Sequence, residues 1–308
     1  MLNYLIRRIF ISILVLFGIS ILVFSVIHLV PGDVTMTILG RQNVSPQKVA
    51  ELREQLGLND PIYVQYWHYL TKALHGDLGT SIRNKLPVAQ AIATQMPSTF
   101  VLSMAALLVA LSLGGILGLL ASINHGTWID TLVMALSVSG LSIPTFWMGL
   151  LLILLFSVRL GLFPSISSGS SFRELFLPAL TLGLPEATVC ARMVRASMLD
   201  VLSKDYITTA RAKGLPERVV ILKHALRNAL IPVVTFLGLQ MAYLLSGATI
   251  VETMFARQGI GRLAVQSIYN RDYPMVQGVV LVTAIIYVVI NTLTDITYVF
   301  LNPRIRLK

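Results

Sequence analysis

The sequence is poor in charge and in cysteine. Asp, Glu, Lys and Arg make up 12% of its 308 residues, against about 25% in an average soluble domain. The single cysteine, Cys190, excludes an internal disulfide and a multi-cysteine metal site. The phosphate-loop pattern GxxxxGK(S/T) and the HExxH and GxSxG motifs are absent, and the five histidines are scattered. We therefore expect no catalytic constellation and no cofactor bound by this chain.

Hydrophobic residues make up 55% of the chain and form long blocks. Five blocks of at least 20 residues contain no Lys, Arg, Asp or Glu, and a helix of about 20 apolar residues crosses a bilayer. A shorter sixth block contains Glu186. The sequence predicts an all-α polytopic membrane protein with six transmembrane helices, the first within 1–30 and the others at about 97–123, 131–158, 175–195, 229–251 and 275–300.

The first block is interpreted as a retained span rather than a signal peptide, because Pro31-Gly32-Asp33 after it is no cleavage site. Lys and Arg then set the orientation. Eight of the Lys and Arg residues in the short loops lie in 192–227, and this excess favours a cytoplasmic position for that loop. We expect both termini in the cytoplasm of a bacterium or archaeon, an outer segment at 31–95, a core at 96–300 with a cytoplasmic loop at 196–228, and a tail at 301–308.

The net charge of +10 is attributed in part to contact with anionic lipid headgroups. No nucleic-acid partner is expected, because the basic residues flank spans and accompany no recognised binding module. Within the cytoplasmic loop, Gly214-Leu215-Pro216 predicts a turn between helices at about 197–213 and 216–227. In the second helix Val219, Leu222 and Leu226 are expected to share one apolar face. Such a pair either lies on the membrane surface or docks a soluble partner.

Small residues recur every fourth position in the second span, and this spacing permits close approach of another helix. They are Ala106, Ala110, Gly114, Gly118 and Ser122. Packing within the chain is favoured over an interface between subunits. Pro144 and Pro185 interrupt the third and fourth spans and are interpreted as static kinks.

The loop motifs DYITTARAKGL (205–215) and HALRNALIP (224–232) resemble the coupling loop of binding-protein-dependent ABC importers. In that family the pattern is Glu-Ala-Ala, three residues, Gly, and the helix fits a groove on the ATPase subunit. Ala210 and Gly214 match this pattern, whereas Thr208 and Thr209 replace its Glu and first Ala. The resemblance implies that the ATPase contacts residues 208–217, namely Thr208, Thr209, Ala210, Arg211, Ala212, Lys213, Gly214, Leu215, Pro216 and Glu217.

The resemblance extends along the chain through HLVPGD, HGDLGTSI, RASMLDVLSKDY, VETMF, GIGR, RDYPMVQG and NPRIR. Together these motifs are similar to the first permease subunit of dipeptide, oligopeptide, glutathione and nickel importers. One departure is Arg257-Gln258, where members of that family often carry Trp-Pro. The resemblance implies a type I ABC importer permease fold, a second homologous permease, two ABC ATPase subunits holding ATP and Mg, and an extracytoplasmic solute-binding protein. The chain itself would be no enzyme.

Two acids within predicted spans are candidates for the translocation pathway, because ionisable residues at membrane depth are costly. Glu186 would meet a polar substrate or pair with Arg192. Asp295 would do the same or pair with an Arg of the cytoplasmic loop. It shares a polar helix face with Asn291, Thr294 and Tyr298.

The outer loops offer candidates for the gate or for contact with the binding protein. They are Gly259, Gly261, Arg262, Arg271, Asp272 and Tyr273. A di- or oligopeptide is the expected solute. Nickel or a metal chelate is the alternative, although no His/Cys cluster would hold a bare metal. A channel and an intramembrane enzyme using Glu186 with Asp295 remain as rivals from other classes.

Overall fold

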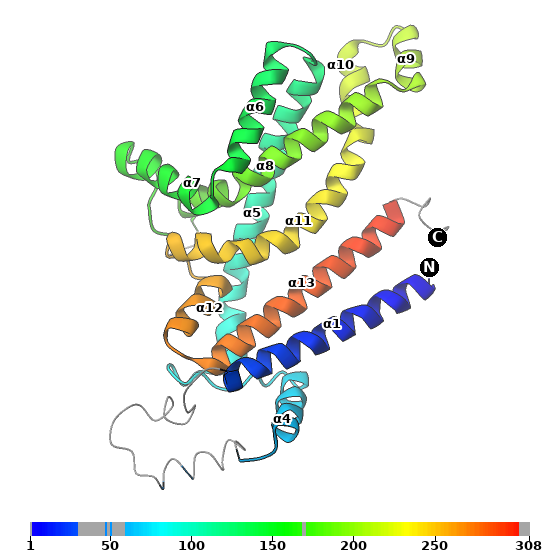
Figure 1. Ribbon diagram of the computed structural model, residues 1–308. Helices are drawn as coiled ribbons and strands as arrows, with labels where there is room; N and C mark the ends of the chain where they lie inside the picture. Colours follow the sequence, from blue (N-terminus) through cyan, green and yellow to red (C-terminus); the bar gives the residue numbers. More distant parts are fainter. Residues whose placement is uncertain (1, 30–46, 48–49, 51–58, 168–170, 302–308) are drawn as a thin grey trace. The chain divides into compact units, whose positions relative to one another are not determined.

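The computed structural model describes residues 2–29, 47, 50, 59–167 and 171–301 (Figure 1). Most of the predicted outer segment before Asn59, and the tail after Leu301, lie outside these residues. The described residues are helical apart from turns and one isolated bridge between Thr80 and Pro87. The helices are α1 (Leu2–Leu29), α4 (Ile62–Leu74), α5 (Val88–Ile123), α6 (Trp128–Ser142), α7 (Thr145–Leu152), the π-helical η1 (Ile153–Arg159), α8 (Phe172–Leu202), α9 (Asp205–Ala212), α10 (Glu217–Val219), the π-helical η2 (Val220–Ala225), α11 (Leu226–Met254), α12 (Ile260–Tyr269) and α13 (Tyr273–Leu301).

By length and composition, four of the described helices can cross a membrane, and six spans result if two bent helix pairs are each counted as one. The four lie in α1, α5, α8 and α13. The prediction of an all-α membrane protein is therefore confirmed, and its six spans agree with the larger of these two counts. The fourth span, which the sequence marked least clearly, is α8 and runs for 31 residues through Pro178 and Pro185 without a break.

The third predicted span, 131–158, differs from expectation. The chain turns by 106° between α6 and α7, so Pro144 separates two helices rather than kinking one. Ile143 and Pro144 are both extended, with ψ of 121° and 138°. A proline disfavours the helical region for the residue before it, which explains the break. At 15 residues α6 is about 22 Å long, shorter than a bilayer core of about 30 Å.

The chain divides into two compact units, residues 1–97 with 262–289 and residues 98–261 with 290–308. In the first unit α1 packs on α4, where the Ser20 and Tyr66 hydroxyls are hydrogen-bonded at 2.8 Å and Phe24 contacts Tyr69. The Gln277 amide donates to the Val23 carbonyl at 3.1 Å and so joins α13 to α1.

In the second unit the small residues of α5 pack against α8. A Cβ atom at Gly114 would lie 2.5 Å from the Ala187 carbonyl oxygen and 2.6 Å from the Cys190 Cβ. One turn on, Gly118 meets Ala191 and Val194 in the same way. Ala106 and Ala110 are fully buried. Packing within the chain is therefore confirmed for this stripe of small residues.

We expect Gly114→Ala and Gly115→Ala to have opposite effects. The first places a methyl group into α8, and overpacking of this kind costs about 1–3 kcal/mol. The second places it in open space, with nothing within 4 Å, and alanine is favoured over glycine inside a helix by about 1 kcal/mol. Thermal unfolding of the purified variants in detergent measures the difference. Equal midpoints for the two variants would contradict the packing.

Candidate functional site

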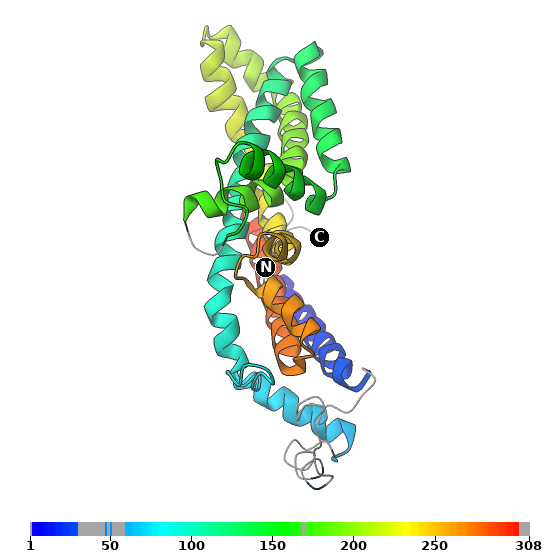
Figure 2. The same ribbon diagram turned by 90° about the vertical axis from the view of Figure 1, so that its left-hand side faces the viewer.

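Helix α9 and the turn after it lie between the end of α8 and the start of α11 (Figures 1 and 2). Two side chains anchor α9: Ile207 is fully buried and Ala210 is 8% exposed. They join a core cluster with Met198 and Val201 of α8 and Val220 of η2. Of the ten residues 208–217, all except Ala210 are exposed. One face of α9 is therefore packed against its own chain, and the other face is accessible to a partner.

The turn after α9 fixes the direction of the chain. The Gly214 N–H donates to the Arg211 carbonyl at 2.9 Å and the Leu215 N–H to the Ala210 carbonyl at 3.4 Å, the pair of bonds that ends many helices with a left-handed glycine. Gly214 has φ +73°. Across the turn, Arg211 Nη2 lies 2.7 Å from Glu217 Oε1. The Arg211 guanidinium lowers the pKa of Glu217, although both side chains are exposed and the pair adds little stability.

The helices around this turn differ from their predicted bounds. The expected helix 197–213 is broken at Ser203 and Lys204, where Lys204 is extended and α9 begins anew at Asp205. The expected helix 216–227 is not separate, because α10 continues through η2 into α11. The predicted apolar face does not form the packed side of this segment: Leu222 is 56% exposed, whereas Val220, Ala225 and Ala229 are buried. The π-helical turn adds a residue to each turn and shifts the face.

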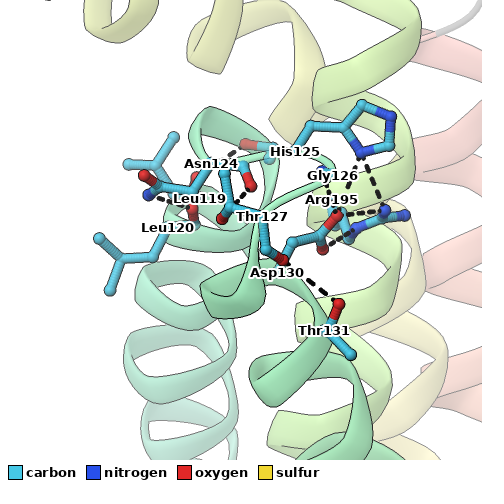
Figure 3. Close-up of polar contacts among 10 residues, drawn as sticks. Leu119, Leu120, Asn124, His125, Gly126, Thr127, Asp130, Thr131 and Arg195 are labelled. Atoms are coloured by element: carbon cyan, nitrogen blue, oxygen red, sulfur yellow. Dashed lines mark hydrogen bonds and ion pairs between the residues drawn. The ribbon is translucent and has the colours of Figure 1, made fainter.

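An ion pair ties the turn between α5 and α6 to α8, and Figure 3 shows its side chains converging. Asp130, in the first turn of α6, is 4% exposed. It accepts from Arg195 Nε at 2.6 Å and from Arg195 Nη2 at 2.8 Å. It also accepts from the Gly126 N–H at 3.1 Å. A carboxylate and a guanidinium joined by two hydrogen bonds form one of the stronger polar contacts in proteins.

His125 completes this cluster. Its Nδ1 lies 3.1 Å from both Asp130 Oδ2 and Arg195 Nη2, so the tautomer decides whether it donates to the first or accepts from the second. Arg195 precedes the end of α8 at Leu202 by seven residues, about 10 Å along the helix. Sequence reasoning missed the contact. The available signal was Asp130, the single acid at the start of an apolar helix, but nothing in the sequence distinguished Arg195 from Arg192 as its partner.

Glu186 and Asp295, the two acids predicted for the pathway, contact different neighbours. Glu186 is 6% exposed and accepts a hydrogen bond from the Gln240 side-chain amide of α11. Arg192, the alternative partner, is exposed. Glu186 is therefore satisfied by a neutral amide.

The polar face of α13, formed by Asn291, Thr294 and Asp295, contacts α11 away from the position that Glu186 contacts. Thr294 packs on Gly238, where an added Cβ atom would lie 3.0 Å from the Thr294 Cγ2 atom. Asn291 and Asp295 are half-buried, and the Tyr298 side chain is outside the described residues. Gly238 and Gln240, two residues apart, point to nearly opposite sides of α11 because each residue turns a helix by about 100°. Glu186 and Thr294 thus contact different faces of α11.

Gly259 and Gly261 surround a buried carboxylate. Glu252 is fully buried and accepts from the Thr99 hydroxyl at 2.5 Å and from the Gly261 N–H at 2.9 Å. A Cβ atom at Gly259 would collide with that carboxylate, and one at Gly261 with Thr249. The two glycines therefore have a packing reason to be glycine. A contact with a binding protein stays a prediction for them.

Arg257, part of the Arg257-Gln258 departure from the family pattern, has a structural role. Arg257 is 2% exposed and its Nη1 donates to the Ser167 hydroxyl at 2.8 Å. The Ser167 N–H in turn donates to the Phe255 carbonyl at 2.8 Å. Burial lowers the pKa of the Arg257 guanidinium. This arginine fastens the loop before α8 to the end of α11.

The remaining outer-loop candidates lie in the first unit. Arg262 and Tyr273 are half-buried, and Arg271 is exposed. Asp272 is 4% exposed and accepts from the Ser81 hydroxyl at 2.5 Å and from the Ile82 N–H at 3.1 Å. The motifs HGDLGTSI and RDYPMVQG, far apart in sequence, therefore meet at this carboxylate.

Two family models match the chain. Residues 114–307 match the binding-protein-dependent transport system inner membrane component, and residues 1–104 match the N-terminal part of the membrane component of such systems. The chain is 45% identical over all 308 residues to the glutathione transport system permease protein GsiC of Escherichia coli O6:H1 (strain CFT073), with full coverage of both chains. It is 44% identical, again over both full lengths, to the same-named proteins of Escherichia coli K12 and Salmonella typhimurium LT2.

Solved structures share the fold. An inward-facing structure of the MetNI methionine ABC transporter matches with a TM-score of 0.57 at 20% identity, covering 69% of this chain and 97% of that one. An amino acid ABC transporter crystallised with histidines matches with a TM-score of 0.53 at 15% identity, covering 68% and 93%. The fold is therefore that of a type I ABC importer permease. The chain belongs to the binding-protein-dependent transport system inner membrane components, the multi-pass permease subunits of ABC importers, which are not themselves enzymes.

Proposed function

We propose that this chain is one of two permease subunits of an ATP-driven importer that carries a small peptide, with glutathione and dipeptides as the first candidates. The identity of 45% over the full length to a glutathione permease is the observation that carries the choice of solute. Nickel or a metal chelate is the second candidate. The described residues hold no group of three or more His, Cys, Asp or Glu side chains able to bind a metal, which argues against a bare nickel ion, whereas a chelated metal would need no such ligands.

The coupling role is proposed for residues 208–217. A helix that docks an ATPase must be rigid toward its own subunit and open toward its partner. The burial of Ile207 and Ala210 beside an otherwise exposed surface meets both requirements. In this proposal both termini and this surface are cytoplasmic, ATP and Mg are held by two ATPase subunits, and a second homologous permease completes the pathway. Closure of the ATPase pair would move α9 and, through the shared core, α8 and α11.

Purification of the tagged chain in mild detergent tests the class of function. We expect a second permease and vanadate-sensitive ATPase subunits to co-purify. Proteoliposomes containing that complex and its solute-binding protein should accumulate labelled glutathione or a dipeptide in an ATP-dependent manner, and should not accumulate nickel ions. Nickel uptake without peptide uptake would show that the solute is nickel rather than a peptide. A chain that purifies alone and inert would overturn the importer and favour a channel.

Glu186→Gln and Asp295→Asn are expected to reduce peptide uptake at least tenfold while the complex still assembles. In Glu186→Gln the Gln240 amide loses the charge on its acceptor, and a positively charged amino group of the solute would lose an attractive carboxylate. Uptake by proteoliposomes and co-purification of the other subunits measure the two effects. Asp60→Asn, a change at an exposed acid just before α4, is the control. Wild-type uptake by both variants would exclude a pathway role for these acids.

A further inference from the structure

Two segments of the first unit are joined into one rigid surface. They are the loop 76–87, between α4 and α5, and the turn 269–273, between α12 and α13. The Asp272 carboxylate connects them by accepting from the Ser81 hydroxyl at 2.5 Å and the Ile82 N–H at 3.1 Å. Ser81 is 1% exposed and Asp272 is 4% exposed. A charged hydrogen-bond pair buried to this degree holds both segments in fixed register.

The loop is also fixed internally. The Asn84 N–H donates to the Ser81 hydroxyl at 3.0 Å and the Lys85 N–H to the Ser81 carbonyl at 3.1 Å. The Ser81 N–H donates to the Leu86 carbonyl at 2.9 Å. Ser81 thus uses its hydroxyl, its N–H and its carbonyl to close the turn around Arg83. A loop bonded in this way presents its tip in one conformation.

These two joined segments carry three exposed cations, Arg83, Lys85 and Arg271. Asp77 and Asp272, the two acids in the segments, are already engaged, Asp77 by the Gly79 N–H at 2.9 Å. Among the residues that the structure describes, none of the three cations forms an ion pair with an acid. Within the part of the chain that the structure describes, this surface therefore keeps its positive charge.

The backbone at two of these cations is unfavourable. Lys85 has φ +57° and Arg271 has φ +55°, a left-handed region that residues other than glycine rarely adopt. Strain of this kind concentrates where a side chain must be held in one place for binding. Tyr269, 86% exposed, stands two residues from Arg271, and tyrosine and arginine are enriched at protein interfaces.

We propose that Arg83, Lys85 and Arg271, hereafter the basic platform, dock an acidic face of the solute-binding protein on the outer side of the membrane. This inference rests on the proposed function, because it requires an importer with a binding protein on that side. Fixed, unpaired charges accelerate association with a protein of opposite charge and fix its register. Lipid headgroups are fluid and gain nothing from a strained, rigid loop, so a folded partner is favoured.

The test uses the complete transporter in nanodiscs and its cognate solute-binding protein. We measure the association rate constant at about 20 mM and about 300 mM NaCl, where screening differs strongly. Arg83→Glu combined with Lys85→Glu should slow association at least tenfold at low salt and flatten its salt dependence. Ser81→Ala, which keeps every charge but removes the clasp to Asp272, should also slow association. Arg173→Glu, an exposed cation of the second unit, is the control and should change the rate less than twofold.

Co-purification and basal ATPase activity verify that each variant is assembled. An unchanged rate in the double variant, with normal binding by the wild type, would overturn the basic platform and leave the proposed function intact. Absence of any binding protein that associates with the wild-type complex would overturn the proposed function itself. A loss confined to discs containing phosphatidylglycerol, and absent in phosphatidylcholine, would assign the cations to lipid and also overturn the proposal.

Discussion

Gly214→Pro is expected to uncouple ATP hydrolysis from transport in the assembled complex, lowering uptake and substrate-stimulated ATPase activity at least tenfold. Gly214 has φ +73°, whereas the proline ring fixes φ near −65°. Proline also removes the N–H that donates to the Arg211 carbonyl at 2.9 Å. The turn must therefore open, and the exposed residues on both sides of it leave the surface that α9 presents. Uptake and ATPase activity measured on the same proteoliposomes give the result.

Gly161→Pro is the matched control. Gly161 has φ +62° and an open environment, so the substitution forces a similar backbone change in a loop of the same unit, away from α9. Its ATPase activity should still respond to the solute. Gly214→Ala, which retains the N–H and costs about 1 kcal/mol, should give an intermediate loss. Unchanged substrate-stimulated ATPase activity in Gly214→Pro would contradict the coupling role of this turn.

Local signals in the sequence predicted the turn at Gly214 and most of the membrane helices. Glycine at the end of one helix and proline before the next favour a turn through their own backbone angles. This turn can therefore be predicted without knowing its tertiary contacts. The same holds for the apolar blocks, because bilayer thickness alone sets their length. The small residues of α5 were also informative, since an added Cβ at Gly114 or Gly118 would meet α8 directly.

Features that depend on tertiary contacts escaped prediction. The burial of Val220 in place of Leu222 follows from a π-helical turn that no residue type announces. The 106° bend at Pro144 could not be told from a modest kink, because α8 contains two prolines without breaking. The partners of Asp130 and Asp272 lie 65 and 190 or more residues away in the chain. Periodicity describes faces of one helix and carries no information on such distant pairs.

Arg195→Ala is expected to be the most destabilising single change around the turn between α5 and α6. It leaves the Asp130 carboxylate, 4% exposed, without two charged hydrogen bonds of 2.6 and 2.8 Å. Loss of such bonds costs about 2–3 kcal/mol, equivalent to a Tm lower by about 3–5 °C in a chain of this size. Arg192→Ala, an exposed cation less than one turn away on α8, should change the Tm by no more than about 2 °C. Thermal unfolding of the purified complex measures both, and a wild-type Tm for Arg195→Ala would contradict the contact.

Asp130→Leu combined with Arg195→Leu separates stability from positioning. Replacing both members of a buried pair by apolar residues is often neutral, because no charge is then left unpaired. The double variant should therefore recover most of the Tm lost in Arg195→Ala. We expect solute uptake by the double variant to be low. Two leucines do not reproduce the hydrogen bonds that fix the position of the α5–α6 turn relative to α8. Recovery of uptake together with the Tm would mean that the pair only stabilises the fold. Continued loss of uptake at normal Tm would mean that motion of α9 and α8 reaches α6 through this ion pair.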